Sequence, residues 1–471
     1  MSLPQELARE YLDLLDQTSV AYQFARYGLA LRYEMLPEQV VHTAKRCLMD
    51  AVGCMIGALD APAYFMIEEM ARELGGREEA TVVGSGLRTT AVNATLVNSL
   101  LVRFLDYNDN GGGGHNSDTI PSILAVAERE KSTGKDFLTS LVLSYELGQR
   151  YMSGGGRPLG DFVMDIRVSV SLPPCFGRLM GLNELQIANA IGICAAHNLP
   201  LGILDTDMEA NYNVKNLRVG FGARSAIEAC LLAKKGFTGH IRIFEGERGL
   251  NEVVFGSAKN KDKMLDWSGW SITNVRHKGI PCNATSQGQA YATIYNVTEN
   301  DIKPEDIESI VLYAGERESK HTTTLAKKYP INAETADHSA FYINAIAIRD
   351  RSFTVAAMDE HNFTDPVIIE LIDKMTVKAH PDMPSFGNAG MSVITLKDGR
   401  VFTKRVDDPP GISETPHTDQ ELESKFKSLV APYLSDNETD KLLETIWSID
   451  KLDDISDFTR LLVTKNRKFP K

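Results

Sequence analysis

The sequence predicts a mainly α-helical protein that contains a smaller α+β part. Apolar residues recur at helical spacing through roughly the first 260 positions and again near the C-terminus. Between about residues 267 and 404, short β-branched runs alternate with helical segments, which is typical of an α+β domain. We therefore expect one large all-helical domain formed by both chain ends, residues 1–266 and 411–471, with an α+β domain inserted at residues 267–410.

Helical patterns organise the N-terminal part. They cover Leu36–Leu59, Thr90–Leu105, Ser122–Lys131, Asp136–Arg150, Glu184–Cys194 and Arg218–Lys235. The segment that begins at Thr90 is apolar on most sides, which predicts a helix buried inside a bundle. Ser117, Asp118 and Pro121 form a start signal before the third segment, and Gly236 is placed to end the last one.

The α+β part carries both strand and helix patterns, and the tail is helical again. The β-branched runs are Ile307–Tyr313, Thr376–Ala379 and Met391–Leu396, and helical spacing occupies Gly288–Tyr295 and Ser339–Arg349. Residues 408–411, Asp-Pro-Pro-Gly, are a turn that marks the domain boundary. The tail at Asp419–Leu462 is divided into two helical segments by the polar stretch LSDNETD.

Composition limits the function classes. The sequence contains 50 Lys and Arg residues and 63 Asp and Glu residues, which gives a net charge of −13. We expect neither nucleic-acid nor membrane partners, because phosphates and anionic lipids require a basic face. No apolar run is long enough for a transmembrane helix, and the start MSLPQELARE is unlike a signal or transit peptide. The six cysteines form no CxxC motif, so we expect buried free thiols in a cytoplasmic protein.

The densest group of chemistry-bearing residues is RFLDYNDNGGGGHNSD, which runs from Arg103 to Asp118. Here a buried helix ends in carboxylates and amides, and four glycines lead to a histidine before the next helix. Glycine lets a ligand approach the backbone, and a helix start offers N–H groups to an anion. His115 and Asp106 are therefore acid–base candidates, with Arg103 and Asn110 as binding residues. The alternative is a surface loop of ordinary caps and turn formers.

Two basic groups lie further along the chain. Lys215 precedes a helix, where it and neighbouring arginines could bind a carboxylate; a solvated helix start is the alternative. Arg276, His277 and Lys278 open the α+β part, and clefts form at such junctions, although a basic triplet is often only a surface face. His338 is as consistent with a helix cap as with catalysis. We found no metal-ligand spacing, phosphate loop or nucleophile elbow, so we expect no metal and no organic cofactor.

Several colinear blocks resemble the MmgE/PrpD family. They are AKRCLMDAVGCMIGAL, AVNATLVNSLLVRFLDYND, HNSDTIPSILAVAE, GLNELQIANAIGIC, AIEACLLAKKGFTG, FEGERGL, KMTVKAHPDM and ELESKFKSL, in the order of the family. The resemblance implies a large all-helical domain, a smaller α+β lid domain and a homodimer. It also implies an active site between the domains that needs neither metal nor organic cofactor.

The resemblance also assigns site residues. The family's substrate-cleft positions fall on Asp106, His115, Lys215 and Lys278. Beside them we expect substrate-binding residues at Arg103, Asn110, Arg276, His277, Asn283 and Gln287. Gln287 resembles the dehydratase branch of the family. Three residues depart from the family's pattern. Asn283 stands where the decarboxylases have a lid histidine, Thr285 where the dehydratases have a histidine, and Asn110 where a threonine is common.

From the resemblance we expect a cofactor-independent lyase that acts on a small di- or tricarboxylate. The first expectation is a 2-methylcitrate dehydratase-like dehydration that starts by proton abstraction next to a carboxylate. His115 would move the proton, and Asp106 would orient His115 or act as the partner base. Lys215 and Lys278 would bind the substrate carboxylates in a cationic cleft. The alternatives are an isomerase or epimerase, a decarboxylase on a cis-aconitate-like or amino- or imino-dicarboxylate substrate, and a non-catalytic carboxylate binder.

Overall fold

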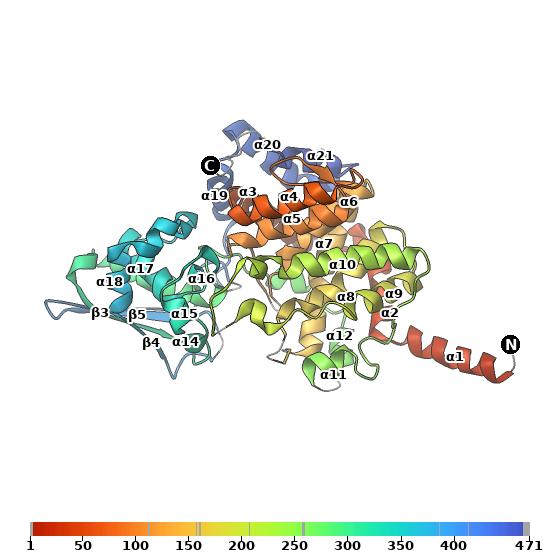
Figure 1. The fold of residues 1–471 in the computed structure, drawn as a ribbon, viewed down its shortest axis with the longest axis horizontal. Helices are drawn as coiled ribbons and strands as arrows, with labels where there is room; N and C mark the ends of the chain where they lie inside the picture. Colours follow the sequence, from red (N-terminus) through yellow and green to blue (C-terminus); the bar gives the residue numbers. More distant parts are fainter. Residues whose placement is uncertain are drawn as a thin grey trace.

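The computed structural model describes residues 3–464, except 112–113, 157, 160–161, 207, 257–259, 386 and 413. A helical domain and a smaller α+β domain lie side by side (Figure 1). One hydrophobic core draws on residues 20–272 and 422–462, and a separate core draws on residues 280–396. The predicted fold class, mainly α with a small α+β part, is confirmed.

The helical domain is a bundle around α5. Its helices are α1 (Leu3–Gln17), α2 (Val20–Ala30), α3 (Glu38–Gly57), α4 (Pro62–Leu74), α5 (Ala91–Phe104), α6 (Ile120–Arg129), α7 (Gly134–Gly155), α8 (Val168–Leu179), α9 (Glu184–Ala195), α10 (Arg218–Lys234), α11 (Leu250–Phe255), α12 (Lys261–Met264), α19 (Asp419–Val430), α20 (Asp436–Trp447) and α21 (Ser456–Thr459). Strands β1 (Ala80–Thr81) and β2 (Arg88–Thr89) form a short ribbon beside it. As its sequence predicts, α5 is buried on nearly all sides, between α3, α4, α6 and α10.

The C-terminal part of the chain returns to the N-terminal part where α19 packs on α3 (Figure 1). Glycines on α3 permit this approach. A Cβ atom at Gly53 would lie 3.1 Å from Phe426 Cδ2, and one at Gly57 would lie 3.0 Å from Leu429 Cδ2. The tail therefore completes the core of the helical domain.

The α+β domain is built on a four-stranded sheet in the order β4 (Met375–Ala379), β3 (Ile307–Ala314), β5 (Gly390–Leu396), β6 (Val401–Val406). β3 is parallel to β4 and antiparallel to β5, and β5 is antiparallel to β6. The longer helices of this domain are α13 (Gln287–Glu299), α17 (Ala340–Asp350) and α18 (Pro366–Asp373). α13 packs on β5 and β6, and α17 packs against both α13 and α18.

Three short helices complete the α+β domain: α14 (Glu318–His321), α15 (Leu325–Lys328) and α16 (Ala333–Ala336). α16 faces the helical domain, because Asn211 Nδ2 donates to the Glu334 carbonyl oxygen at 3.0 Å. The Asn211 N–H also donates to the Thr335 hydroxyl at 3.1 Å. These contacts bring the loop before α10 against the α+β domain.

The helices and strands predicted up to residue 404 are confirmed, with ends that differ by a few residues. The tail is helical as predicted, but it holds α19, α20 and α21, and most of the stretch LSDNETD lies inside α20. Gly236 follows α10 with a φ of +91°, and the six cysteines are buried and unpaired. Several elements were not predicted, among them α1, α2, α4, α8, α18, the ribbon of β1 and β2, and β6. α8 holds Pro173 and Pro174 inside the helix, which obscures the helical pattern, and β6 is an edge strand without an apolar run. No single described helix is both long and apolar enough to cross a membrane.

Candidate active site

Charged side chains from both domains converge beyond the C-terminal end of α5. Asp106 follows the helix with a left-handed backbone, φ +44°, and its carboxylate contacts the Arg103 guanidinium. Lys278, on the segment that enters the α+β domain, places Nζ 3.0 Å from Asp106 Oδ1 and 2.6 Å from the Asp106 carbonyl oxygen. Burial raises the pKa of Asp106, but Arg103, Lys278 and Lys215 together lower it well below its usual value. Asp106 is therefore ionised and anchors the connection between the domains.

His115 lies directly before a 3₁₀ turn at Asn116–Thr119. Its Nδ1 is 2.8 Å from the Asp109 carbonyl oxygen, which can only accept, so Nδ1 carries the hydrogen. Burial, and then the Arg103 cation, lower the pKa of His115 well below its usual value. The neutral ring directs its unprotonated Nε2 toward Asp106, 4.0 Å from Oδ1. This is the state that a general base requires, and the Asp109 backbone rather than the Asp106 carboxylate orients the ring.

Lys215 joins the helical domain to the α+β domain. Its Nζ lies 3.0 and 2.9 Å from the two carboxylate oxygens of Asp337 and 3.2 Å from His338 Nδ1. All three side chains are buried, and burial followed by Lys215 lowers the pKa of His338 to about 4. The three N–H groups of Lys215 are thus engaged. In this structure the carboxylate that Lys215 binds is Asp337.

A buried arginine pair extends the cluster. Arg218 Nε lies 2.6 Å from Asp165 Oδ2, and Arg218 Nη1 lies 3.0 Å from Asp205 Oδ2. Arg167 contacts Asp165 at 2.5 Å and donates to the His115 carbonyl oxygen at 2.7 Å. Our sequence reasoning missed Arg167, Asp165 and Asp205. The first two were detectable as a charged pair in the otherwise apolar stretch FVMDIRVSVSL, because such residues are rarely buried without a purpose.

Cations and carboxylates balance in the described part of this cluster. The cations are Arg103, Arg167, Lys215, Arg218 and Lys278, and the carboxylates are Asp106, Asp118, Asp165, Asp205 and Asp337. This corrects our expectation of a cleft with excess positive charge, because each cation already faces a carboxylate of the protein. Burial raises the pKa of Asp118 to about 6, although Arg103 opposes that rise.

Several polar atoms of the cluster are buried without a hydrogen bond in the described part of the chain. They are Arg103 Nε, Asp106 Oδ2, Asp118 Oδ2 and Asp205 Oδ1. Buried polar atoms are normally paired, so unpaired ones at one place indicate where a ligand or ordered water binds. Lys278 also has a third N–H for which the described residues show no acceptor. The cluster therefore retains unused hydrogen-bonding capacity.

The other predicted binding residues lie beside the cluster. Asn110 and Arg276 pair through their backbones at 2.8 and 2.7 Å. Asn283 accepts a hydrogen bond from the Thr285 N–H and donates its own N–H to the Asp337 carbonyl oxygen at 2.7 Å. Gln287 donates to the Ile280 carbonyl oxygen at 2.8 Å. Within the described residues, none of these four side chains shares a hydrogen bond or ion pair with Asp106, His115, Lys215 or Lys278.

The domains are closed on each other around the cluster. The cavity that touches Asn110, Arg276, Lys278 and Gln287 measures only about 10 Å³, the space of roughly one water molecule. A larger cavity of about 220 Å³ adjoins the cluster at Asp165 and Arg218. The cluster therefore has room for about one water molecule beside Lys278 and a larger space beside Asp165 and Arg218.

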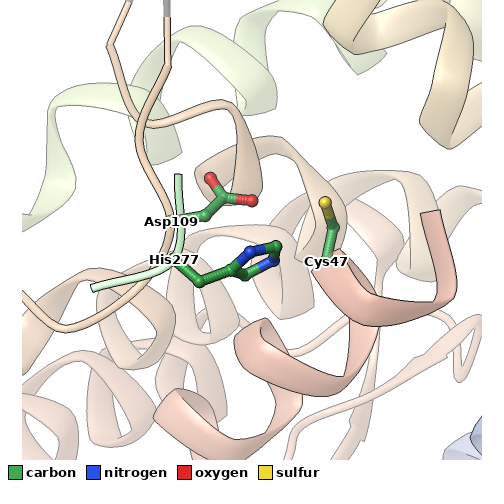
Figure 2. Close-up of side chains that lie close together, drawn as sticks. All are labelled: Cys47, Asp109 and His277. Carbon is green, nitrogen blue, oxygen red and sulfur yellow. The ribbon is translucent and has the colours of Figure 1, made fainter. Parts of the chain in front are cut away.

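His277 does not join this cluster. Its imidazole ring lies beside Cys47 of α3 and Asp109, as Figure 2 shows. Burial lowers the pKa of His277 to about 4 and raises the pKa of Asp109 to about 6. We expected His277 in the substrate cleft, but the structure places its side chain beside Cys47 and Asp109.

Comparisons with known proteins match both parts of this chain. Residues 22–263 match the MmgE/PrpD N-terminal domain, and residues 280–450 match the MmgE/PrpD C-terminal domain. The chain is 24% identical to cis-aconitate decarboxylase of Homo sapiens over 94% of each chain, and 21% identical to that of Aspergillus terreus over 97% of this chain and 98% of the relative. It is also 24% identical to 2-methylcitrate dehydratase of Escherichia coli K12, over 95% of this chain and 94% of the relative. The chain therefore belongs to the MmgE/PrpD family.

Proposed function

We propose that this chain is a lyase that acts on a small polycarboxylate, with a dehydration of the 2-methylcitrate type as the first candidate reaction. Its relatives include both dehydratases and decarboxylases, at similar identities. The observation that carries the proposal is the buried, neutral His115, whose Nε2 points at a cluster of ionised groups from both domains.

The proposed reaction begins with proton transfer. His115 Nε2 takes a proton from the carbon next to a substrate carboxylate, while its Nδ1–H stays bound to the Asp109 carbonyl oxygen. The electron pair of that C–H bond moves first into the carboxylate and then into a new C=C bond. The hydroxyl on the neighbouring carbon takes up a proton and leaves as water. The imidazolium of His115 can supply that proton, so the histidine returns to its neutral state.

Lys278 is the best placed cation to stabilise the negative charge that forms. It has one N–H beyond its two contacts with Asp106, and Arg103 Nε beside it also lacks a hydrogen bond among the described residues. Preorganised donors aimed at developing charge are the strongest contributors to catalysis of this kind. We assign Lys215 a different role. Its ammonium holds Asp337 and His338 in place, and thereby holds the lid on the helical domain.

The test is a substrate screen in D₂O read by NMR, with 2-methylcitrate, citrate, cis-aconitate and amino- or imino-dicarboxylates. We expect alkene signals from a hydroxy acid, and His115→Ala should lower turnover by at least roughly 100-fold. A matched control is His361→Ala, because this histidine side chain is 98% exposed. Turnover that His115→Ala leaves unchanged would remove His115 from the mechanism. Release of CO₂ from cis-aconitate without any dehydration would instead establish decarboxylation.

A second candidate is an isomerase or epimerase that acts on an amino- or imino-dicarboxylate. The Asp205 carboxylate beside His338 favours it, because its Oδ1 has no hydrogen bond among the described residues and can accept a cationic nitrogen. In this reaction His115 would remove a proton and the other face of the carbon would receive one. The NMR screen separates the two candidates. Deuterium uptake without a new C=C signal indicates the epimerase, and an alkene product indicates the lyase.

We also propose that the chain acts as a homodimer in the cytoplasm. Large apolar side chains are exposed together around the loop before α10, including Ile203 at 65%, Met208 at 74% and Phe221 at 50%. Apolar surface of this kind commonly marks a protein interface. Light scattering after gel filtration should give twice the chain mass of 52.0 kDa. A particle of single-chain mass at micromolar concentration would contradict the dimer.

A further inference from the structure

Cys47, Asp109 and His277 form a second cluster of reactive side chains. Figure 2 shows them turned toward one another from α3, from the loop after α5 and from the segment that enters the α+β domain. One ligand-type atom from each lies within 4.8 Å of the other two. Cys47 and Asp109 are fully buried, and His277 is 4% exposed.

Asp109 and His277 are incompletely paired in the described structure, whereas the Cys47 thiol is in hydrogen-bonding contact with Asp109 and Tyr145. Asp109 accepts hydrogen bonds from the Ser117 hydroxyl and N–H and from the Tyr145 hydroxyl, all of which are neutral donors. No ion pair to Asp109 is present among the described residues. His277 Nε2 is buried there without any hydrogen-bond partner. A buried carboxylate without a counter-charge costs free energy, and so does a buried imidazole nitrogen without a hydrogen-bond partner.

We propose that Cys47 Sγ, Asp109 and His277 Nε2 bind one Zn²⁺ ion. Thiolate, imidazole and carboxylate are the three ligand types that zinc uses in proteins. On binding, the Cys47 thiol releases its proton to solvent and forms an S–Zn bond. The metal then balances one thiolate and one carboxylate, so the buried group carries no net charge.

The geometry is close to what such a site needs. Ligand atoms of a tetrahedral zinc site lie roughly 3.5 Å apart, so the three atoms need to approach one another by about 1 Å. Ser117 and Tyr145 already fix the Asp109 carboxylate, as groups behind a metal ligand commonly do. Three protein ligands leave the fourth position for a small ligand such as water.

The location suggests what the ion would do. The His277 N–H donates to the Gly411 carbonyl oxygen at 3.0 Å, so the two chain segments that link the domains meet at this residue. A side chain at residue 411 is excluded there, because a Cβ atom would lie 1.8 Å from the His277 carbonyl oxygen. A zinc ion would bind these segments to α3 and fix the base of the lid. This role is independent of the reaction proposed above.

The test measures metal content and ligand type in the full-length, tag-free protein. We expect close to one zinc per chain by mass spectrometry after growth with added zinc and dialysis. Cobalt added to metal-stripped protein should produce the near-ultraviolet charge-transfer band of a thiolate–cobalt bond. Zinc should also raise the melting temperature, because an ion that binds the folded state alone stabilises it.

Variants locate the site. Cys47→Ser should abolish the cobalt band, and His277→Gln should weaken zinc binding by at least roughly 10-fold. Cys54→Ser is the matched control, because Cys54 is a buried thiol of the same helix and should leave both signals unchanged. His277→Gln alone decides the matter if Cys47→Ser does not fold. Less than one tenth of a zinc per chain in the wild type, or equal binding by His277→Gln and wild type, would overturn the proposal.

Discussion

The ion pair between Lys215 and Asp337 joins the two domains, and its contribution to stability can be measured. Methionine at position 215 keeps most of the side-chain volume but removes the ammonium group, which lies 3.0 and 2.9 Å from the Asp337 oxygens. Among the described residues, Asp337 then keeps only His338 as an ionisable hydrogen-bond donor. Removing one partner of a buried ion pair costs about 3–5 kcal/mol, because the other charge stays buried. We expect Lys215→Met to lose about that much free energy of unfolding.

Urea denaturation at pH 8, followed by far-UV circular dichroism, measures this loss. The double variant Lys215→Met/Asp337→Asn carries no uncompensated charge, so it should recover about 2 kcal/mol relative to Lys215→Met. The control is Lys303→Met, which breaks an exposed pair with Asp301 and should cost under about 1 kcal/mol. If Lys215→Met loses no more than this control, the contact does not join the domains as we argue.

The pH dependence of the same variant gives a second readout. Lys215 lowers the pKa of His338, so removing the ammonium raises that pKa. A protonated His338 can then replace the missing cation beside Asp337. The stability gap between wild type and Lys215→Met should therefore narrow as the pH falls from 8 to 5, whereas a widening gap would contradict this reasoning.

Three further predictions concern single side chains. Arg167→Lys keeps the charge, but lysine cannot contact both Asp165 and the His115 carbonyl oxygen. We therefore expect kcat to fall at least about 10-fold without loss of helicity, and an unchanged kcat would contradict this role of Arg167. Asp118 has a folded-state pKa of about 6, above its unfolded value, so wild-type stability declines as the pH rises through 6. Asp118→Asn removes that decline, and thermal unfolding should show it gaining about 1.4 kcal/mol on the wild type between pH 5 and 8, whereas a constant difference would refute the shift. Gly288→Ala places a Cβ atom 2.0 Å from the Asn388 carbonyl oxygen, so it should destabilise the α+β domain by about 1–3 kcal/mol, and unchanged proteolysis of residues 280–400 would contradict this.

Much of the fold could be predicted because its signals are local. The apolar pattern of α5 gave a buried helix, and β3, β4 and β5 were visible as β-branched runs. α8 could not be predicted in this way, since Pro173 and Pro174 conflict with helical propensity and only packing against α7, α9 and α10 compensates for them. β6 has too little buried apolar surface to leave a pattern, because it is stabilised by its ladder with β5.

The candidate site was predicted in part. Asp106, His115, Lys215 and Lys278 were named from the sequence and its family resemblance, and the structure brings them into one buried cluster. Their partners were not predictable in the same way. That Lys215 binds Asp337, and that Arg167 supports the His115 backbone, depends on segments more than 50 residues apart in the chain.

The sequence by itself determined many of the helical and strand segments, the acidic net charge and the candidate acid–base residues, because these follow from side-chain type and local spacing. Only the tertiary structure decided how charges are paired and which groups remain unpaired. Among the residues that the structure describes, the site holds five carboxylates against five cations, and His277 turns from Lys278 toward Cys47 and Asp109. Both facts have the same physical reason. A buried charge is controlled by whichever side chains the fold brings within a few ångströms of it, and those residues can be anywhere in the sequence.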